Sequence, residues 1–148
     1  MPRVPPNRLW PSCARSPAVF CRRYSPTAGS KAHSPVLPRP ARVPCRIDVE
    51  ASARCAASVE ATAYFVVAET LTNIARHSGA RHAAVTVHNR ADRLYLTISD
   101  DGRGGADENG GSGLAGIRGR IAAHDGTFTV TSPSGGPTTL KAELPCGS

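Results

Sequence analysis

The sequence lacks long apolar runs and has few aromatic residues. Phe, Trp and Tyr make up 5% of its 148 residues, and its apolar runs are as short as Tyr64 to Ala68. No stretch approaches the roughly 18 apolar residues that a membrane-spanning helix needs, and no apolar signal-peptide core follows the N-terminus. We therefore expect no membrane span in this chain and a cytoplasmic location.

The cysteines lack the spacing of a metal site. Their number, five, is odd, no CxxC pair occurs, and no His/Cys cluster has the spacing of zinc ligands. This pattern favours free thiols in a reducing compartment. The positions concerned are Cys13, Cys21, Cys45, Cys55 and Cys146.

Acidic residues are missing from the first 42 positions. Residues 1–42 hold eight Lys/Arg and nine of the 13 prolines, whereas residues 43–148 hold ten Lys/Arg against eleven Asp/Glu. The formal net charge of +7 therefore comes from a tail and not from a face of the domain. A segment without a hydrophobic period cannot offset its ordering entropy by burial. We expect residues 1–41 to be a disordered Pro/Arg-rich tail and residues 42–148 to form one domain.

The tail allows three other interpretations. Its Arg/Ser-rich, acid-free composition is typical of an organellar transit peptide, but its prolines oppose the amphipathic helix that such a peptide forms. The second interpretation is that the true start lies further in and that the tail is a truncation or gene-start artefact. Nucleic-acid binding is the third and the weakest, because only Trp10, Phe20 and Tyr24 supply rings that could stack on bases. No nucleic-acid partner is expected.

The domain is predicted to begin with a strand and a long helix. Residues 42–50 alternate apolar and polar side chains, as a strand does. Ser58 is a candidate N-cap, with Glu60 in the first helical turn. An apolar helical stripe follows, and Gly79 lies just beyond its end. The stripe consists of Ala63, Val67, Leu71 and Ile74.

Four further strands and a second helix are predicted after it. Strands at 85–87 and 94–98 flank a turn at 89–92 and form a hairpin. A loop with six glycines between 102 and 113 precedes a helix that contains Leu114, Ile117 and Ile121 and ends near Gly126. Strands at 128–130 and 140–144 flank a Pro/Gly-rich turn. This order predicts an α/β fold: a two-layer sandwich with helices on one face of a mixed, largely antiparallel sheet.

Three segments of the domain carry chemistry, and the first is ETLTNIARH on the long helix. Glu69, Asn73 and His77 recur every four residues there and share one stripe. Carboxylate and amide oxygens can hold Mg²⁺ or its waters, and Arg76 or His77 can approach phosphates. Taken alone, the segment is more typical of an ordinary polar helix face.

The second segment, DDGRG, directly follows a predicted strand. The Asp100 carboxylate at the strand end can accept a hydrogen bond from the amino group of a purine. Gly102 and Gly104 let the backbone approach a flat ring closely. Taken alone, the string is as typical of a solvated acidic turn.

The third segment, GSGLAG, opens the second helix, where unpaired N–H groups and the helix dipole favour a phosphate. The string matches GxGxxG, but a glycine-rich loop precedes it instead of a strand. The sequence about 20 residues on reads SGGP, without an acid, so a dinucleotide-binding fingerprint is excluded. No GxxxxGK[ST] P-loop occurs in the chain either.

Together, the three segments resemble the histidine-kinase-type ATPase domain, whose superfamily includes gyrase, the Hsp90 chaperones, histidine kinases and the MutL proteins. ETLTNIARH resembles its N box, DDGRG its first glycine box and GSGLAG its second. The sequence of these segments is most similar to that of bacterial two-component sensor histidine kinases, in the branch that includes nitrate and membrane-fluidity sensors. The resemblance covers about residues 42–146 and implies the Bergerat-type ATP-binding fold.

The resemblance also implies a role for each matching residue. Asn73 would ligate Mg²⁺, and Glu69 would act beside it as a catalytic and metal-site residue. Arg76 and His77 would line the phosphates, and Asp100 would bind the adenine amino group. The remaining ATP-binding positions would be Gly102, Gly104, Gly111, Gly113, Leu114, Gly116 and either Thr138 or Thr139.

The function implied is transfer of the ATP γ-phosphate, with Mg²⁺, to a histidine supplied in trans. The partner would be a histidine-containing dimerisation domain or a response regulator. We expect a fragment that does not label itself, because 42 Pro-rich residues cannot form the helical hairpin that carries the acceptor in these kinases. The alternative is a stand-alone serine kinase of the anti-sigma-factor type, which has the same fold and needs no dimerisation domain.

Overall fold

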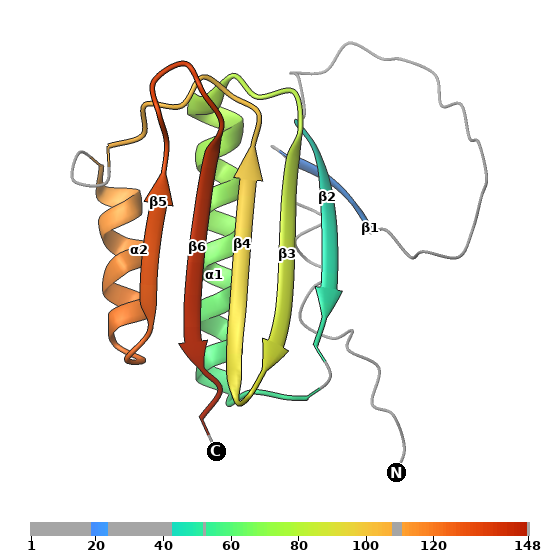
Figure 1. Cartoon of the computed structure of the whole chain (residues 1–148), viewed down its shortest axis with the longest axis vertical. Helices are drawn as coiled ribbons and strands as arrows, with labels where there is room; N and C mark the ends of the chain where they lie inside the picture. Colours follow the sequence, from blue (N-terminus) through green and yellow to red (C-terminus); the bar gives the residue numbers. More distant parts are fainter. Residues whose placement is uncertain (1–18, 24–42, 52, 108–110, 148) are drawn as a thin grey trace.

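The computed structural model describes residues 19–23, 43–51, 53–107 and 111–147 (Figure 1). For residues 19–23 only the backbone is described. Most of the tail that was expected to be disordered, and with it the transit-peptide and nucleic-acid interpretations, therefore lies outside the described residues. Among those that are described, no helix is long and apolar enough to span a membrane.

Six strands form one mixed sheet in the order β1-β2-β3-β4-β6-β5. β1 and β2 are parallel, as are β2 and β3, whereas the other three pairings are antiparallel. The strands are β1 (Val19–Arg23), β2 (Val43–Glu50), β3 (Ala83–Arg90), β4 (Arg93–Asp100), β5 (Thr127–Thr131) and β6 (Thr138–Pro145).

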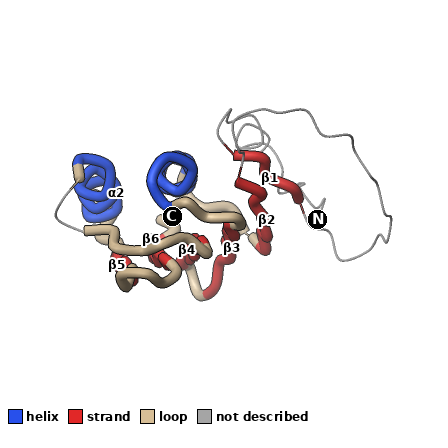
Figure 2. Tube along the Cα trace, turned by 90° about the horizontal axis from the view of Figure 1, so that it is seen from above, coloured by secondary structure: helices blue, strands red, loops and turns tan. Residues whose placement is uncertain are grey.

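Two helices cover one face of this sheet, α1 (Ala57–Asn73) and α2 (Ser112–Ala122), as Figure 2 shows from above. α1 continues as a π-helical turn, η2 (Ile74–Ser78), and ends at Gly79, whose φ of 65° places it in the left-handed region. The prediction of a two-layer α/β sandwich with a mixed, largely antiparallel sheet is confirmed. The predicted end of the long helix at Gly79 is confirmed as well.

The core lies between the helices and the sheet. Alternate strand residues point inward, so Val85 and Val87 of β3 and Leu96 of β4 are each 1% exposed. The predicted stripe on α1 faces them, with Ala63 and Val67 fully buried. Because these positions follow from periodicity alone, they are the part of the fold that the sequence specifies most directly.

A two-residue turn joins β3 to β4, as the sequence predicts. Arg90 pairs with Arg93, and Ala91 and Asp92 between them have φ values of 50° and 62°. Positive φ at both central positions belongs to a type I′ turn, whose twist matches that of the flanking strands.

The predicted N-cap at Ser58 is wrong. α1 begins at Ala57, after Ala56, and no side chain caps it. Instead, the Glu60 carboxylate reaches back to the Cys55 N–H (3.2 Å) and the Arg54 Nε (3.1 Å). A carboxylate in the first turn satisfies a donor ahead of the helix and opposes the helix dipole favourably.

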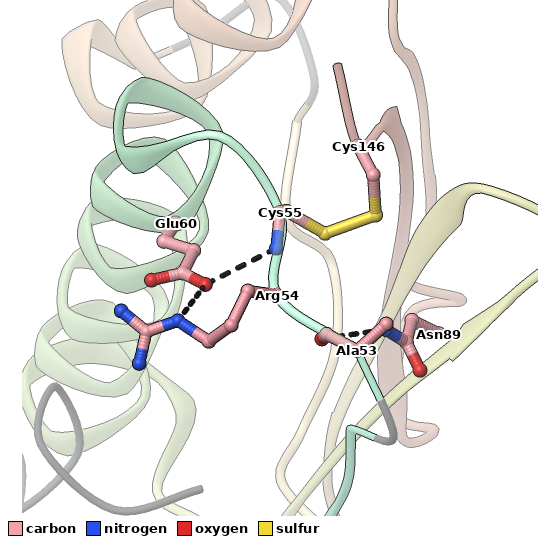
Figure 3. Close-up of a disulfide and its surroundings, with 6 residues drawn as sticks. All are labelled: Ala53, Arg54, Cys55, Glu60, Asn89 and Cys146. Atoms are coloured by element: carbon pink, nitrogen blue, oxygen red, sulfur yellow. Dashed lines mark hydrogen bonds and ion pairs between the residues drawn. A yellow bond between two sulfur atoms is a disulfide. The ribbon is translucent and has the colours of Figure 1, made fainter. Parts of the chain in front are cut away.

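The expectation that all five cysteines are free thiols is also wrong. Cys55 and Cys146 form a disulfide that joins the segment before α1 to the residue after β6 (Figure 3). The two residues are 91 positions apart, and no spacing pattern in the sequence indicates that they pair. Among the cysteine side chains that the structure describes, Cys45 lies outside any disulfide; it is buried, and its thiol donates to the Arg46 carbonyl at 3.6 Å.

The strand β1 was not predicted. It lies within the Pro/Arg-rich segment and pairs with β2 in parallel, from Val19 opposite Val43 to Arg23 opposite Ile47. Pairing along a sheet edge uses backbone groups, so it needs no apolar period in the added strand. In the described part of the chain the order of elements after β1 is the predicted one.

Candidate functional site

A cavity of about 710 Å³ lies where α1 ends, β4 leaves the sheet and α2 and β6 begin. It brings together residues from all three segments that the sequence singles out. Of the predicted site residues, the cavity is lined by Glu69, Asn73, Arg76, His77, Asp100, Gly104, Gly111, Gly113, Leu114 and Thr138.

Three predicted site residues are not among those that line the cavity: Gly102, Gly116 and Thr139. Gly102 lies directly behind the lining, because a Cβ there would come within 2.5 Å of both the Asp100 Oδ1 and the Ser78 carbonyl oxygen. Gly116 is exposed on α2, with nothing within 4 Å of a built Cβ. Thr139 points away because strand residues alternate, so of the two threonines left open by the sequence it is Thr138 that faces the cavity.

The π-helical turn changes the polar stripe of the N-box helix. Glu69 and Asn73 belong to α1, whereas His77 lies in η2. A π turn advances fewer degrees per residue than an α turn, so His77 is rotated away from the line through Glu69 and Asn73. Single π turns of this kind occur frequently at functional sites, and here all three side chains still line the cavity.

Glu69 and Asn73 converge beside the first turn of α2. A Cβ on Gly113 would lie 3.1 Å from the Glu69 Oε1 and 3.2 Å from the Asn73 Nδ2. A side chain at this position would require both polar heads to shift by a few tenths of an ångström. One carboxylate and one amide oxygen suit Mg²⁺, which usually takes one or two protein ligands and completes its shell with water and phosphate. The described residues include no cluster of three or more His, Cys, Asp or Glu that could hold a metal by themselves.

Asp100 is the buried acid of the site. It is 5% exposed, and its Oδ1 accepts a hydrogen bond of 2.8 Å from the Gly102 N–H. Burial raises the pKa of Asp100 above its ordinary value, and the neighbouring Asp101 charge adds to this, while the Gly102 hydrogen bond opposes it. A buried carboxylate at a cavity wall is a specific acceptor, because a ligand must offer it a donor.

Asp101 lies beside it in the sequence but does not line the cavity. Its carboxylate accepts hydrogen bonds from the backbone N–H groups of Arg81 (2.7 Å) and His82 (2.8 Å), and the His82 ring nitrogen lies 3.1 Å away. The hydrogen bonds from His82 lower the pKa of Asp101 to about 2. Asp101 therefore holds the start of β3, and of the two acids it is Asp100 that lines the cavity.

Behind the part of the cavity wall formed by Gly104 and Thr138 lies the turn between β5 and β6. Gly104 has a φ of 61°, and a Cβ on it would run into the carbonyl oxygens of Pro133 and Gly136. The Ser132 hydroxyl lies 2.8 Å from the Thr138 hydroxyl and accepts the Ala106 N–H at 2.9 Å. Gly104 thus allows the loop to lie against this turn.

Sequence reasoning missed the apolar floor of the cavity and five polar residues of its lining: Thr70, Ser78, Arg103, Asp107 and Ser112. Arg103 lines the cavity, and its N–H donates to the Ser78 carbonyl at 2.9 Å. Both lie within or next to predicted motifs, which was the available signal. The floor is formed by Ile74, Ile98, Val130 and Leu140, which periodicity assigns only to the core.

Comparisons with known proteins show the family to which the chain belongs. Residues 58–148 match the family of histidine kinase-, DNA gyrase B-, and HSP90-like ATPases. The chain is 42% identical over 89 residues to the sensor histidine kinase YxjM of Bacillus subtilis. This match covers 59% of the chain and 21% of that protein. It is 35% identical over 91 residues to the histidine-protein kinase/phosphatase UhpB of Salmonella typhimurium, covering 60% of the chain and 18% of that protein. The chain thus spans about a fifth of the length of these relatives.

Solved structures share the fold. The histidine kinase AdeS of Acinetobacter baumannii superimposes with a TM-score of 0.60 at 21% identity, over 73% of this chain and 56% of that one. A histidine kinase domain from Erythrobacter litoralis gives a TM-score of 0.55 at 21% identity, over 69% and 52%. The family match covers more than half of the chain and includes the whole cavity. The chain belongs to the histidine kinase-, DNA gyrase B- and HSP90-like ATPase family.

Proposed function

We propose that this chain is the ATP-binding catalytic domain of a two-component sensor histidine kinase. The observation that carries the proposal is the single cavity that gathers the N-box side chains, Asp100 and the glycine-rich start of α2. The relatives in the comparisons are named sensor histidine kinases, which favours a histidine acceptor over the serine acceptor of the anti-sigma-factor kinases.

Different residues of the cavity bind the base and the phosphates of ATP. Asp100 accepts a hydrogen bond from the adenine amino group, while the apolar floor packs against the ring. Arg76, His77 and Arg103 lie around the cavity and attract the phosphates, and the free N–H groups at the start of α2 can bind them. The γ-phosphoryl group then faces outward, toward an acceptor that is not part of residues 43–147.

The proposed reaction also requires a bound magnesium ion. Glu69 and Asn73 are the residues that would hold Mg²⁺, whose charge offsets that of the phosphates during transfer. In the transfer, the bond between the γ-phosphorus and the bridging oxygen breaks, and a bond to the imidazole nitrogen of the acceptor forms. ADP leaves with the bonding electrons. The contribution of the protein is positioning and electrostatics.

The partners follow from the proposed reaction. A dimerisation domain would supply the histidine, and a response regulator would take the phosphoryl group from it. A cytoplasmic location is part of the proposal, because ATP is available there. The Cys55–Cys146 disulfide is an observation against a cytoplasmic location, since reducing compartments keep thiols free.

Calorimetry of the full 148-residue chain with Mg·ATP tests the proposal. We expect binding in the wild type and a loss of at least tenfold in affinity in Asp100→Asn, since an amide has one acceptor oxygen, which cannot serve both the Gly102 N–H and the adenine amino group. Asp101→Asn is the matched control and should bind ATP normally, because Asp101 does not line the cavity. A folded wild-type chain that does not bind Mg·ATP would refute the proposed function.

A further inference from the structure

The strand β5 lies at one edge of the sheet, and its outer side is open. It pairs with β6, and no other described segment of the chain pairs with it. Helix α2 lies in the other layer, over one face of the sheet, and does not extend the sheet beyond β5 (Figure 2). A strand at a sheet edge presents a row of backbone N–H and C=O groups that can pair with a further strand. The outer side of β5 is therefore a surface to which a partner's strand can add.

This strand lacks the features that usually protect a sheet edge. Edge strands commonly carry charged side chains, above all Lys, or contain a proline or a bulge. The sequence of β5 is TFTVT, without a charge or a proline. Its pairing with β6 runs without a bulge, from Thr127 opposite Glu143 to Thr131 opposite Thr139. All five residues are of types that favour strands, so this edge is suited to further pairing.

The sequence of β5 fits an antiparallel copy of itself. About a twofold axis at Thr129, each Thr127 lies opposite the partner's Thr131, and each Phe128 lies opposite the partner's Val130. The three threonines are exposed on the uncovered face of the sheet, whereas Phe128 and Val130 are half-buried against the core. Thr–Thr pairs and aromatic–β-branched pairs are favourable across strands. Each side chain of the strand therefore meets a favourable partner, and no like charges meet between the strands.

Helix α2 also allows such a pairing. A twofold axis perpendicular to the sheet keeps both helix layers on one side of the joined sheets, so the two α2 helices become neighbours. Arg118 marks the side of α2 that faces β5, because its guanidinium lies 6.0 Å from the centre of the Phe128 ring. Ala115 and Ala122 share this side of the helix and are exposed. Their small side chains leave room for a second helix, while the like charges of two Arg118 side chains limit the strength of the contact.

We propose that the outer edge of β5 is a self-association surface, on which two copies of this chain pair β5 with β5 in antiparallel orientation and join their sheets into one. Because the same strand pairs with itself, the interface closes at two copies. The pairing is short, so the dimer is weak and depends on protein concentration. The axis places the two cavities at opposite ends of the joined sheets, so the inference does not depend on the proposed function.

Sedimentation velocity of the full chain, from micromolar to millimolar concentration, tests this pairing. We expect the wild type to pass from monomer to dimer without larger species. Thr129→Lys should weaken dimerisation about fivefold or more, because the two new ammonium groups face each other across the axis and Lys141 lies beside each of them on β6. Thr86→Lys is the matched control: it is exposed but lies in the middle of β3, and it should leave dimerisation unchanged.

A charge-reversed variant provides a positive test of the axis at Thr129. Thr129→Glu also places two like charges opposite each other and should dimerise more weakly than the wild type. Mixed in equal amounts, Thr129→Glu and Thr129→Lys should form a heterodimer that is tighter than either variant's own dimer, because opposite charges then meet at the axis. This recovery is expected only if the residue pairs with its own copy.

Several outcomes would overturn the inference. A wild type that stays monomeric at millimolar concentration, or that forms larger species, excludes a closed dimer of this kind. An unchanged dimer in Thr129→Lys, or a mixture that associates no better than the separate variants, excludes pairing through β5. Calorimetry with Mg·ATP keeps the two proposals apart: Thr129→Lys should bind ATP as the wild type does, and a folded wild type that fails to bind ATP would refute the proposed function alone.

Discussion

Asp100 and Asp101 are neighbours in the sequence, yet their carboxylates lie in opposite surroundings. Asp100 is 5% exposed and its pKa is raised by burial, whereas hydrogen bonds from His82 lower the pKa of Asp101 to about 2. A one-residue step along a strand end therefore separates a recognition group from a structural one. The difference arises because one carboxylate points toward the core and the other meets two backbone N–H groups.

The two acids predict opposite responses to pH. The Asp101 pKa is lower in the folded chain than its ordinary value of 3.8, so its stabilisation is present above pH 3.8 and is lost as the pH falls through about 2. The Asp100 pKa is raised, so its contribution is present below pH 3.8 and is lost as the pH rises through the folded value. Urea unfolding of wild type and Asp101→Asn between pH 7 and pH 2 measures the first effect.

The expected result is a wild-type advantage at neutral pH that shrinks toward zero below pH 3.8. A constant difference between the two proteins across that range would contradict the assigned role of Asp101. ATP affinity should fall in the acid range as Asp100 becomes protonated, because a protonated carboxyl no longer offers the base a charged acceptor.

At the scale of elements, helix α2 is unusual for its glycines. Gly113, Gly116 and Gly119 all lie within its 11 residues, although glycine weakens a helix by about 0.5–1 kcal/mol relative to alanine. Their surroundings differ. Gly113 is pressed against Glu69 and Asn73, whereas a side chain on Gly116 or Gly119 would meet nothing within 4 Å.

Matched alanine substitutions in α2 separate these roles. Gly116→Ala should raise the free energy of unfolding by about 0.5–1 kcal/mol and leave ATP affinity unchanged, because Gly116 does not line the cavity. Gly113→Ala should weaken ATP binding at least tenfold, because its Cβ displaces the Glu69 and Asn73 heads. Urea unfolding and calorimetry on both variants give the two measurements. Weaker ATP binding in Gly116→Ala would instead indicate that Gly116 contacts ATP, as the sequence motif predicts.

At the scale of the whole molecule, the disulfide and the cavity lie at opposite ends of the same helix. α1 begins beside Cys55 and ends, through η2, at the cavity. Cys146 is also held by its backbone, since its N–H donates to the Asp92 carbonyl and its carbonyl accepts the Ala56 N–H. The bridge drawn in Figure 3 therefore fastens a junction that these two backbone hydrogen bonds already hold.

The disulfide should matter for stability and not for nucleotide binding. Closing a long loop restricts the unfolded chain, and losing such a bridge costs about 2–4 kcal/mol. Cys55→Ser or added reductant should lower the urea midpoint accordingly and leave ATP affinity of the folded chain unchanged. Cys45→Ser is a matched control for a thiol outside the bridge. Identical midpoints with and without reductant would show that the bridge does not form in solution.

The full chain should bind ATP without labelling itself. Within the described residues, His77 lines the cavity and His82 is engaged with Asp101. The His88 ring stacks on Tyr95, and the His124 ring lies 3.0 Å from the Thr62 hydroxyl. Incubation with γ-labelled ATP should therefore give no acid-labile phosphoprotein band. Such a band from this chain alone would contradict the proposed supply of the histidine in trans.

Local periodicity, glycine positions and turn chemistry already specify the α/β class, the order of elements from β2 to β6 and the three motifs. Ser58 does not cap α1, because Glu60 and the chain before α1 satisfy the helix start. The Cys55–Cys146 bridge, the β1 pairing, the choice of Thr138 over Thr139 and the contact of Ser132 follow only from the folded arrangement. Each of these joins positions through strand register or through the packing of distant segments, and such contacts carry no local signal in the chain.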